Sequence, residues 1–434
     1  MSVKTTVKKL CPEFVLNIYR QLRDCVSAMH YNQCQKKYAR IKKRLRKQIS
    51  GTRHIRVGFY VVYDASWAAV TMFEKMLQDT AFDVKVVVCP DTSRGIENQD
   101  YTLKAVYNRL VVKYGAEYVL SSCNDKHEFM DFSDRFDIIN LANPYDAMTH
   151  KYYGINFLVK KNKLVFYNPY GYSGHLTYTP YLFEHCDSYN MFWKMFVENN
   201  FVKQIAEKHG HIHGKNIVVS GSCRMDTFNS LPSAPKHERK KIILAPHHTV
   251  RRQGFAINLS NFLRFSEFIQ ELPAKYKDID FIFRPHPLLF VTLRCDDVWG
   301  KEKTDSWLER FLGNKNVAYS EGGDFFGVFN ESDAMIQDCG SFLPDYFYTN
   351  KPQCYMLESE KQFEDEFTDF GKKLFDYVYK AFSEQDITDF IENVVIKGND
   401  ALQKERKEFA RREVMVNYPH ATDFAVDYLK KELL

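Results

Sequence analysis

The sequence predicts an α/β protein built from two doubly wound, Rossmann-type domains that face a common cleft, with helical segments at both ends. Its 434 residues, 45% of them hydrophobic, are too many for one compact core and suit two domains of ordinary size. From Ile55 onward, strand-like and helix-like patterns alternate, which is typical of parallel sheets covered by helices. A stretch rich in Pro and Lys, Leu231 to Lys240, interrupts this alternation and is typical of an interdomain linker.

These patterns divide the chain into four parts. We expect a basic helical segment over residues 1–50, a first Rossmann-like domain over 51–232, a second over 233–385 and a helical tail over 386–434.

In the first domain, Ile55–Val62 predicts a buried strand, and a helix pattern follows from Ala65 to Gln78. Val84–Val88 predicts a second strand, and Thr102 to Tyr114 a second helix. Further strands are expected at Tyr118–Ser121, Asp137–Leu141, Leu164–Tyr167 and Asn216–Ser220.

The alternation restarts after the linker, where Lys241–Ala245 predicts a strand and Ser260–Leu272 an amphipathic helix. Strands are expected at Ile279–Phe283, Ala334–Gln337 and Gln353–Leu357, and a long charged helical segment from Asp400 to Leu434. Ligands of open parallel sheets bind beyond the carboxyl ends of the strands, so the residues that follow each strand are the candidates for chemistry.

Composition excludes several classes of protein. No apolar run approaches the ~18 residues that cross a bilayer, and Met1 to Leu16 lacks the hydrophobic core of a signal peptide. The ten cysteines are scattered and include no CxxC pair, which is typical of a reducing compartment and not of a disulfide scaffold or zinc site. We therefore expect a cytoplasmic protein.

The positive charge is concentrated in one segment. Lys36–Lys47 carries eight basic residues and no acid; without it the net charge of +5 would become −3. Ile41, Leu45 and Ile49 share one helix face, so the segment can lie on an anionic membrane surface. The alternative is a solvated helix that joins residues 1–30 to the first domain. Nucleic acid is not expected as a partner, because no basic–aromatic pattern continues beyond this run.

Two strands of the second domain lead into residues that suit a diphosphate. The segment Arg284–Pro287 contains Arg284, whose guanidinium fork matches phosphate oxygens. His286, two residues later, can donate a proton to a leaving phosphate. Asp338–Ser341 joins a strand to a helix start, where free N–H groups at Gly340 and Ser341 can bind phosphate. Asp345, one turn later, can accept hydrogen bonds from ribose or other hydroxyls.

Basic residues also follow Lys241–Ala245, namely His247, His248 and Arg251. Two adjacent histidines point in different directions on an extended backbone, so we do not expect both to bind one metal. Arg224 and Asp226, after the last strand of the first domain, are expected to form a structural ion pair at the hinge.

Two loops of the first domain are candidates to hold the second substrate. One contains Asp64, and the other, Asn168–His175, contains Tyr170; Asp64 and His175 are the side chains able to act as a base. The triplet His209, His211 and His213 resembles a metal cluster, but the neighbouring glycines favour a loop that would not align the three rings.

These motifs, in this order, resemble the CDP-glycerol glycerophosphotransferase family, the teichoic-acid polymerase-like enzymes of GT-B fold. The matching pieces are Val218–Gly221 with Arg224 and Asp226, Ala245-Pro246, Arg284–Pro287, and Ser332–Ser341 continued by Asp345-Tyr346 and Lys351-Pro352. The likeness is good from Gly214 to Met356 and loose in the first domain.

The resemblance implies that the first domain binds the acceptor and the second a CDP-activated alcohol, whose phosphate is transferred to a hydroxyl with release of CMP. His286, Arg284 and Ser341 would contact the diphosphate. The family's polymerases carry a His-Gly-Thr motif whose His is thought to activate the acceptor, whereas the corresponding stretch here is Asn168–Gly171. The base would then be His175, Asp64, or one of His247 and His248 from across the cleft.

We therefore expect a transferase that moves a polyol-phosphate from a CDP-activated donor to a hydroxyl of a cell-surface glycan or lipid-linked precursor. It would act in the cytoplasm or peripherally on the inner face of the bacterial plasma membrane. No metal or further cofactor is expected, because the one Asp-x-Asp, Asp278 to Asp280, opens its strand and lies at the wrong sheet edge. Two alternatives remain: a GT-B glycosyltransferase with a nucleotide-sugar donor for capsule or lipopolysaccharide synthesis, and a catalytically silent nucleotide- or glycan-binding subunit.

Overall fold

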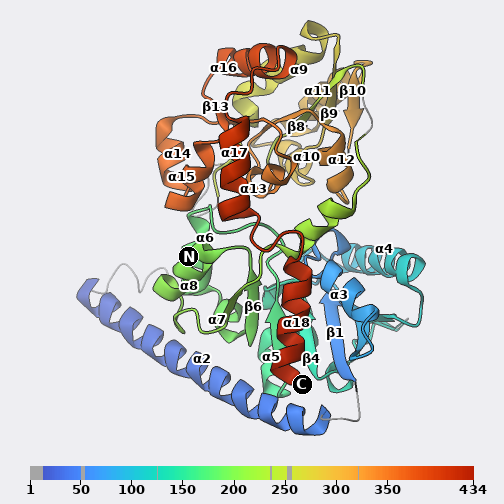
Figure 1. Cartoon of the computed structure of the whole chain (residues 1–434), viewed down its shortest axis with the longest axis vertical. Helices are drawn as coiled ribbons and strands as arrows, with labels where there is room; N and C mark the ends of the chain where they lie inside the picture. The colour runs from blue at the N-terminus through green and yellow to red at the C-terminus, as the bar shows by residue number, and fades with distance from the viewer. Residues whose placement is uncertain (1–12, 50–53, 125, 235–236, 252–256, 321) are drawn as a thin grey trace.

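The computed structural model describes residues 13–49, 54–124, 126–234, 237–251, 257–320 and 322–434, with side chains from Asp24 onward. Two α/β domains lie one above the other, each with its own parallel sheet (Figure 1). The long N-terminal helix lies along the outer side of the first domain, and the C-terminal helix returns to that domain.

The first domain is built on seven parallel strands in the order β3-β2-β1-β4-β5-β6-β7. These strands are β1 (Ile55–Val61), β2 (Phe82–Val88), β3 (Val119–Ser121), β4 (Ile138–Leu141), β5 (Leu164–Tyr167), β6 (Lys194–Val197) and β7 (Ile217–Val219). The helices are α3 (Val70–Leu77), α4 (Ile96–Tyr114), α5 (Ile155–Lys160), α6 (Tyr178–His185), α7 (Asp187–Met191) and α8 (Asn200–His209). Strands β4 and β5 are buried along their whole length, as expected for a sheet covered on both faces.

The second domain has six parallel strands in the order β10-β9-β8-β11-β12-β13. They are β8 (Lys240–Ala245), β9 (Ile279–Phe283), β10 (Val317–Tyr319), β11 (Ala334–Gln337), β12 (Gln353–Met356) and β13 (Tyr379–Ala381). The α-helices are α9 (Phe262–Lys275), α10 (Leu289–Leu293), α11 (Gly300–Leu312), α12 (Phe326–Glu331), α13 (Phe342–Asp345), α14 (Glu360–Glu366), α15 (Asp369–Phe375), α16 (Glu384–Asp389) and α17 (Gln403–Phe409).

Short 3-10 and π-helical segments complete both domains. They are η1 (Asp64–Ser66), η2 (Ser133–Arg135), η3 (Asp146–Met148), η4 (Lys151–Tyr153), η5 (Cys223–Ser230), η6 (Tyr346–Thr349), η7 (Phe390–Ile396) and η8 (Ala410–Val414). The prediction of two Rossmann-like domains is confirmed. Strands β6, β10 and β13 were not predicted, because each is only three or four residues long and β6 and β13 contain a lysine.

The basic segment lies within α2 (Glu13–Ile49). Its apolar face, including Tyr38, Ile41 and Leu45, is buried in the core of the first domain. The apolar face of the basic segment is therefore occupied by protein, and the cations around it are what this segment can present to another surface. No described helix is long and apolar enough to cross a membrane.

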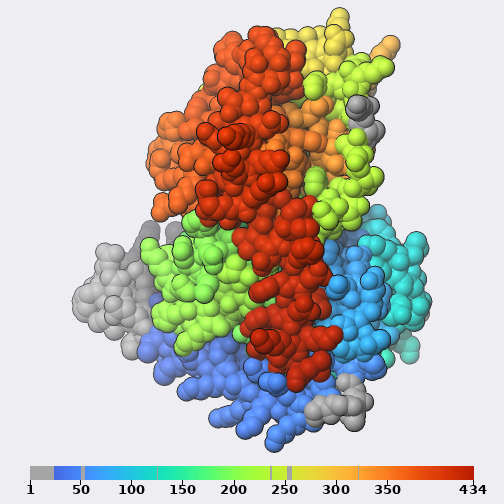
Figure 2. Space-filling model, in the orientation of Figure 1, coloured from blue at the N-terminus to red at the C-terminus, as the bar shows by residue number. Residues whose placement is uncertain are grey.

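The segment after residue 385 does not form a separate tail. Phe390, Ile391 and Val394 of η7 belong to the core of the second domain, whereas Ala425 and Leu429 of α18 (Ala421–Leu433) belong to that of the first. Figure 2 shows the C-terminal segment as a continuous band that passes from one domain to the other.

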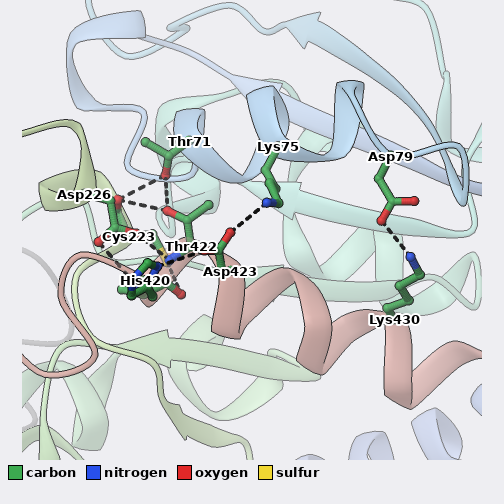
Figure 3. Close-up of polar contacts among 10 residues, drawn as sticks. Thr71, Lys75, Asp79, Cys223, Asp226, His420, Thr422, Asp423 and Lys430 are labelled. Atoms are coloured by element: carbon green, nitrogen blue, oxygen red, sulfur yellow. Dashed lines mark hydrogen bonds and ion pairs between the residues drawn. The ribbon is translucent and has the colours of Figure 1, made fainter. Parts of the chain in front are cut away.

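Ion pairs and a cap fasten α18 to the first domain (Figure 3). Lys430 pairs with Asp79 at 2.7 Å, and Asp423 with Lys75 at 2.9 Å. Asp226 accepts hydrogen bonds from the backbone N–H groups of Ala421 and Thr422, at 3.3 and 2.6 Å. The expectation that Asp226 pairs with Arg224 is wrong, because the unpaired N–H groups that begin α18 occupy this carboxylate.

Candidate active site

The carboxyl ends of β8, β9 and β11 bring three predicted motifs to one edge of the second sheet. Strand β8 lies between β9 and β11, so His247 and His248 lie between the segments that carry His286 and Asp338. This edge faces the first domain, whose loop Asn168–His175 packs against Gly340 and Ser341.

Three histidine rings converge at this edge. The ring centroids of His247 and His248 are 4.4 Å apart, and those of His286 lie 4.9 and 4.1 Å from them. The expectation that the adjacent rings diverge is wrong, because the chain bends at His248 and is not extended there. The bend is held by Asp338, which accepts a hydrogen bond from the backbone N–H of His247 at 2.5 Å.

The hydrogen bonds around these rings determine which nitrogen carries the proton. The backbone N–H of Leu288 donates to Nδ1 of His286 at 3.1 Å, so the proton of that neutral ring is on Nε2. Thr249 Oγ1 accepts from the N–H groups of Leu259 and Ser260, so its own hydrogen is available to Nδ1 of His247 at 2.9 Å. His247 and His286 therefore each present an Nε2–H donor.

Burial keeps these rings uncharged. It lowers the pKa of His286 to about 3 and that of His248 to about 4, and it lowers the pKa of His247 well below its usual value. At neutral pH the three rings are neutral, so an anion that enters meets N–H dipoles and then favours protonation of the rings. In the ligand-free site His286 is thus a hydrogen-bond donor, not a proton donor.

A metal ion fits this trio less well than an anion does. Within the described residues, one nitrogen from each of the three rings lies within 4.8 Å of the others, which is close enough for a shared metal. A metal on Nε2 of His286 would move the ring proton to Nδ1, where it would oppose the N–H of Leu288.

Arg284 does not point into this site. It is only 7% exposed, and its guanidinium donates to Ser320 Oγ at 2.7 Å and to the carbonyls of Gly322 and Gly323 at 2.8 and 3.0 Å. The structure therefore corrects the expectation that this fork is open to phosphate: its Nη atoms hold the loop that follows β10.

Asp338 and Arg251 likewise bind protein groups. Asp338 is fully buried and also accepts from the N–H of Asn261 at 2.6 Å, so it orients the His247–His248 segment. Burial raises its pKa to about 7. Arg251 forms an ion pair with Asp297. Both were expected to contact substrate, and in the structure both act on neighbouring loops.

The turn at Gly340 and Ser341 forms part of the domain interface. His175 is fully buried, and its Nε2–H donates to the carbonyl of Gly340 at 2.8 Å. The helix that follows, α13, is four residues long, so its dipole is weaker than a full helix would supply. Enclosure of the His175 ring excludes it as a base for an entering substrate in this conformation.

Asp64 lies on the wall of a cavity between the domains. The cavity has a volume of 640 Å³, with walls from the first domain and from Gly323, Asp324 and Phe326 of the second. Arg109 holds both oxygens of Asp64, at 2.7 and 2.8 Å. Tyr170, by contrast, is 45% exposed on the first domain.

Two buried acids lie near the interface, close enough for the charge of Asp345 to raise the pKa of Glu198. Glu198, which follows β6, is 3% exposed; among the described residues neither of its carboxylate oxygens makes a hydrogen bond of good geometry, although Ser173 lies close to them. Asp345, at the end of α13, is 7% exposed. Burial raises the pKa of Glu198 to about 8 and that of Asp345 to about 7. Glu198 was missed because β6 was missed; recognition of that strand would have indicated the residue that follows it.

Comparisons with known proteins identify the architecture. No family model and no curated protein sequence matches the chain. A variant of the wall teichoic acid polymerase TagF matches with a TM-score of 0.55 and 14% identity, over 96% of this chain and 98% of that one. S. aureus MnaA in complex with UDP matches with a TM-score of 0.55 and 14% identity, over 88% and 98%.

A UDP-GlcNAc 2-epimerase from Neisseria meningitidis, bound to UDP-GlcNAc, also matches, with a TM-score of 0.53 and 13% identity over 87% of this chain and 100% of that one. These matches cover both domains and both sheets. The chain has the GT-B fold. In this GT-B chain, the edge that carries the three histidines is the edge of the second domain that faces the first.

Proposed function

We propose that the protein is a GT-B transferase that moves a polyol-phosphate from a CDP-activated donor to a hydroxyl of a cell-surface glycan or lipid-linked precursor. The observation that carries the proposal is the convergence of His247, His248 and His286 at the domain-facing edge of the second sheet. Neutral N–H donors in a half-buried site suit the oxygens of a diphosphate.

The proposed reaction forms one P–O bond and breaks another. The acceptor oxygen attacks the β-phosphorus of the donor, the bond from that phosphorus to the bridging oxygen breaks, and CMP leaves. N–H groups of the trio stabilise the charge on the phosphate oxygens, and His286, once protonated in the presence of the dianion, protonates the leaving oxygen.

Among the candidate bases, His248 is the one we assign. Its ring is neutral and has no hydrogen-bond partner among the described residues, so it can accept the acceptor's proton. Asp64 is held by Arg109, and His175 is enclosed at the interface. No metal or further cofactor is required in this scheme.

Calorimetric titration with CDP, CMP, UDP and GDP tests the donor, and a CMP-release assay with CDP-glycerol and an acceptor extract tests the reaction. We expect CDP to bind most tightly and His286→Ala to weaken it by about tenfold, the loss of one charge-assisted hydrogen bond. His185→Ala, on the exposed end of α6, is the matched control. Unchanged CDP affinity and activity in His286→Ala would instead support a silent binding subunit.

A second candidate is a nucleotide-sugar enzyme of the same fold, for example a glycosyltransferase. The buried acids Glu198 and Asp345 favour it, because carboxyl groups with pKa values near 7 suit proton transfer at a sugar. Preference for UDP or GDP without release of CMP would select this candidate.

A further inference from the structure

The interdomain cavity is lined by an arginine, Arg224, that has no polar partner within the part of the chain that the structure describes. Arg224 follows β7, and its guanidinium carbon lies 4.7 Å from the ring centroid of Phe325 and 5.7 Å from that of Phe326, both in the second domain. Among the described residues, it makes no hydrogen bond or ion pair. Burial lowers the pKa of Arg224, and the charges of Asp345 and Asp324 act in the opposite direction.

The other cations on the cavity wall are already occupied. Arg109 is bound to Asp64, and Lys113 is bound to Glu74 at 2.9 Å. Asp324 accepts from the backbone N–H of Phe326 at 2.8 Å. Arg224 is therefore the cation on this wall, within the described ranges, whose N–H donors remain available.

An enclosed guanidinium without a partner is unfavourable, and the two aromatic rings offset only part of the cost. Five N–H donors in a planar fork match the oxygens of a phosphate or carboxylate. A volume of 640 Å³ is within the range that holds a small organic ligand. Size, position and charge together indicate an anionic ligand of small-molecule size or the end of a longer one.

The cavity is next to the histidine trio but distinct from it. Arg284 connects the two: its backbone is two residues from His286, and its side chain holds Gly323, which lines the cavity. A ligand in the cavity would thus lie beside a diphosphate at the trio, on the side formed by the first domain. This is the position that a second substrate must occupy.

We propose that this cavity is the acceptor subsite and that Arg224 binds an anionic group of the acceptor, which is therefore a hydroxyl compound that carries a phosphate. The assignment of the cavity to the acceptor rests on the proposed function, whereas the anion site itself does not depend on that function. A chain end that already carries a polyol-phosphate has this chemistry.

The test uses sn-glycerol 3-phosphate as the probe and glycerol as its neutral counterpart. Titrated into the full-length protein saturated with CDP, glycerol 3-phosphate is expected to bind and glycerol is not. Arg224→Gln should weaken the binding of glycerol 3-phosphate at least tenfold and change the affinity for CDP less than twofold. Arg411→Gln, at an exposed arginine of η8 that has no partner among the described residues, is the matched control and should change neither.

Equal affinity of Arg224→Gln and the wild type for glycerol 3-phosphate would overturn the proposal. Displacement of glycerol 3-phosphate by CDP would also overturn it. If Arg224→Gln does not fold, Arg224→Lys keeps the charge but not the fork and is expected to weaken the probe about threefold to tenfold. Failure of CDP to bind, with glycerol 3-phosphate still dependent on Arg224, would refute the proposed donor and leave the anion site intact.

Discussion

His175 of the first domain donates its Nε2–H to the carbonyl of Gly340 in the second domain, at 2.8 Å, and its Nδ1 is buried with no hydrogen-bond partner among the described residues. One side chain thus joins the loop after β5 to the turn after β11. Because the ring is fully buried, its neutral form is favoured and its pKa falls to about 4.

We expect His175→Ala to lower the free energy of unfolding by about 2 kcal/mol at pH 7, because the Gly340 carbonyl loses its donor inside the protein. Urea unfolding would measure this, with His185→Ala at an exposed site as the control. The folded-state pKa lies below the unfolded value of about 6.5, so the unfolded chain binds the proton first. The His175 contribution therefore falls as pH drops from about 6.5 to 4, and an unchanged acid sensitivity in His175→Ala would contradict it.

Nucleotide binding is expected to take up protons. The trio is neutral without ligand, since burial lowers the pKa of His286 to about 3 and of His248 to about 4, and a bound diphosphate raises both values. CDP affinity should therefore increase as pH falls from 8 to 6, by up to about tenfold per pH unit for each proton taken up. Titration at pH 6 in buffers of different ionisation enthalpy measures the protons directly. Zero uptake, with tight CDP binding, would mean that the rings stay neutral in the complex, which would contradict the role of His286 as proton donor to the leaving oxygen.

Glu198→Gln is expected to stabilise the protein, and to do so more at high pH. The pKa of Glu198 is raised from about 4.5 to about 8 by burial, so the folded protein keeps a proton that the unfolded chain releases. Its contribution to stability is therefore lost as pH rises from about 4.5 through 8. Glutamine keeps the shape without the ionisation, so thermal unfolding should show a gain of melting temperature at pH 8.5 and little at pH 5.

Glu302→Gln, at an exposed site on α11, should show no such pH-dependent gain. An equal effect of Glu198→Gln at both pH values would indicate that Glu198 is already ionised in the folded protein.

Binding of the basic segment of α2 to anionic vesicles is expected to be electrostatic. Ile41 and Leu45 are buried in the first domain, while Lys36, Arg40 and Arg44 are exposed and have no partner among the described residues. Co-sedimentation with vesicles of about 30% anionic lipid should succeed at low salt and fail at about 0.5 M NaCl. Replacement of these three residues by Gln should abolish it.

The control removes the same number of charges from the C-terminal segment, by replacement of Lys404, Lys407 and Arg411 with Gln. It should leave vesicle binding unchanged. Binding that persists in high salt would indicate an apolar contact, for which Val26 and Met29 of α2, 60% and 54% exposed, are candidates.

The sequence by itself determined the architecture and the edge at which chemistry is expected. Apolar runs such as those of β1 and β11 predict buried parallel strands because the pattern is local, and parallel strands necessarily bring His247, His286 and Asp338 to one edge. The short strand β6 carried too little pattern to be recognised, and Glu198 was missed with it.

Only the tertiary structure decided what each side chain does. Arg284 binds the loop after β10, Asp226 caps α18, and Arg224 packs on Phe325 with no polar partner among the described residues. These outcomes depend on contacts between segments that are distant in sequence, such as His175 and Gly340. The direction of a side chain and the pKa of a buried acid are set by surrounding atoms, which residue type and spacing along the chain do not specify.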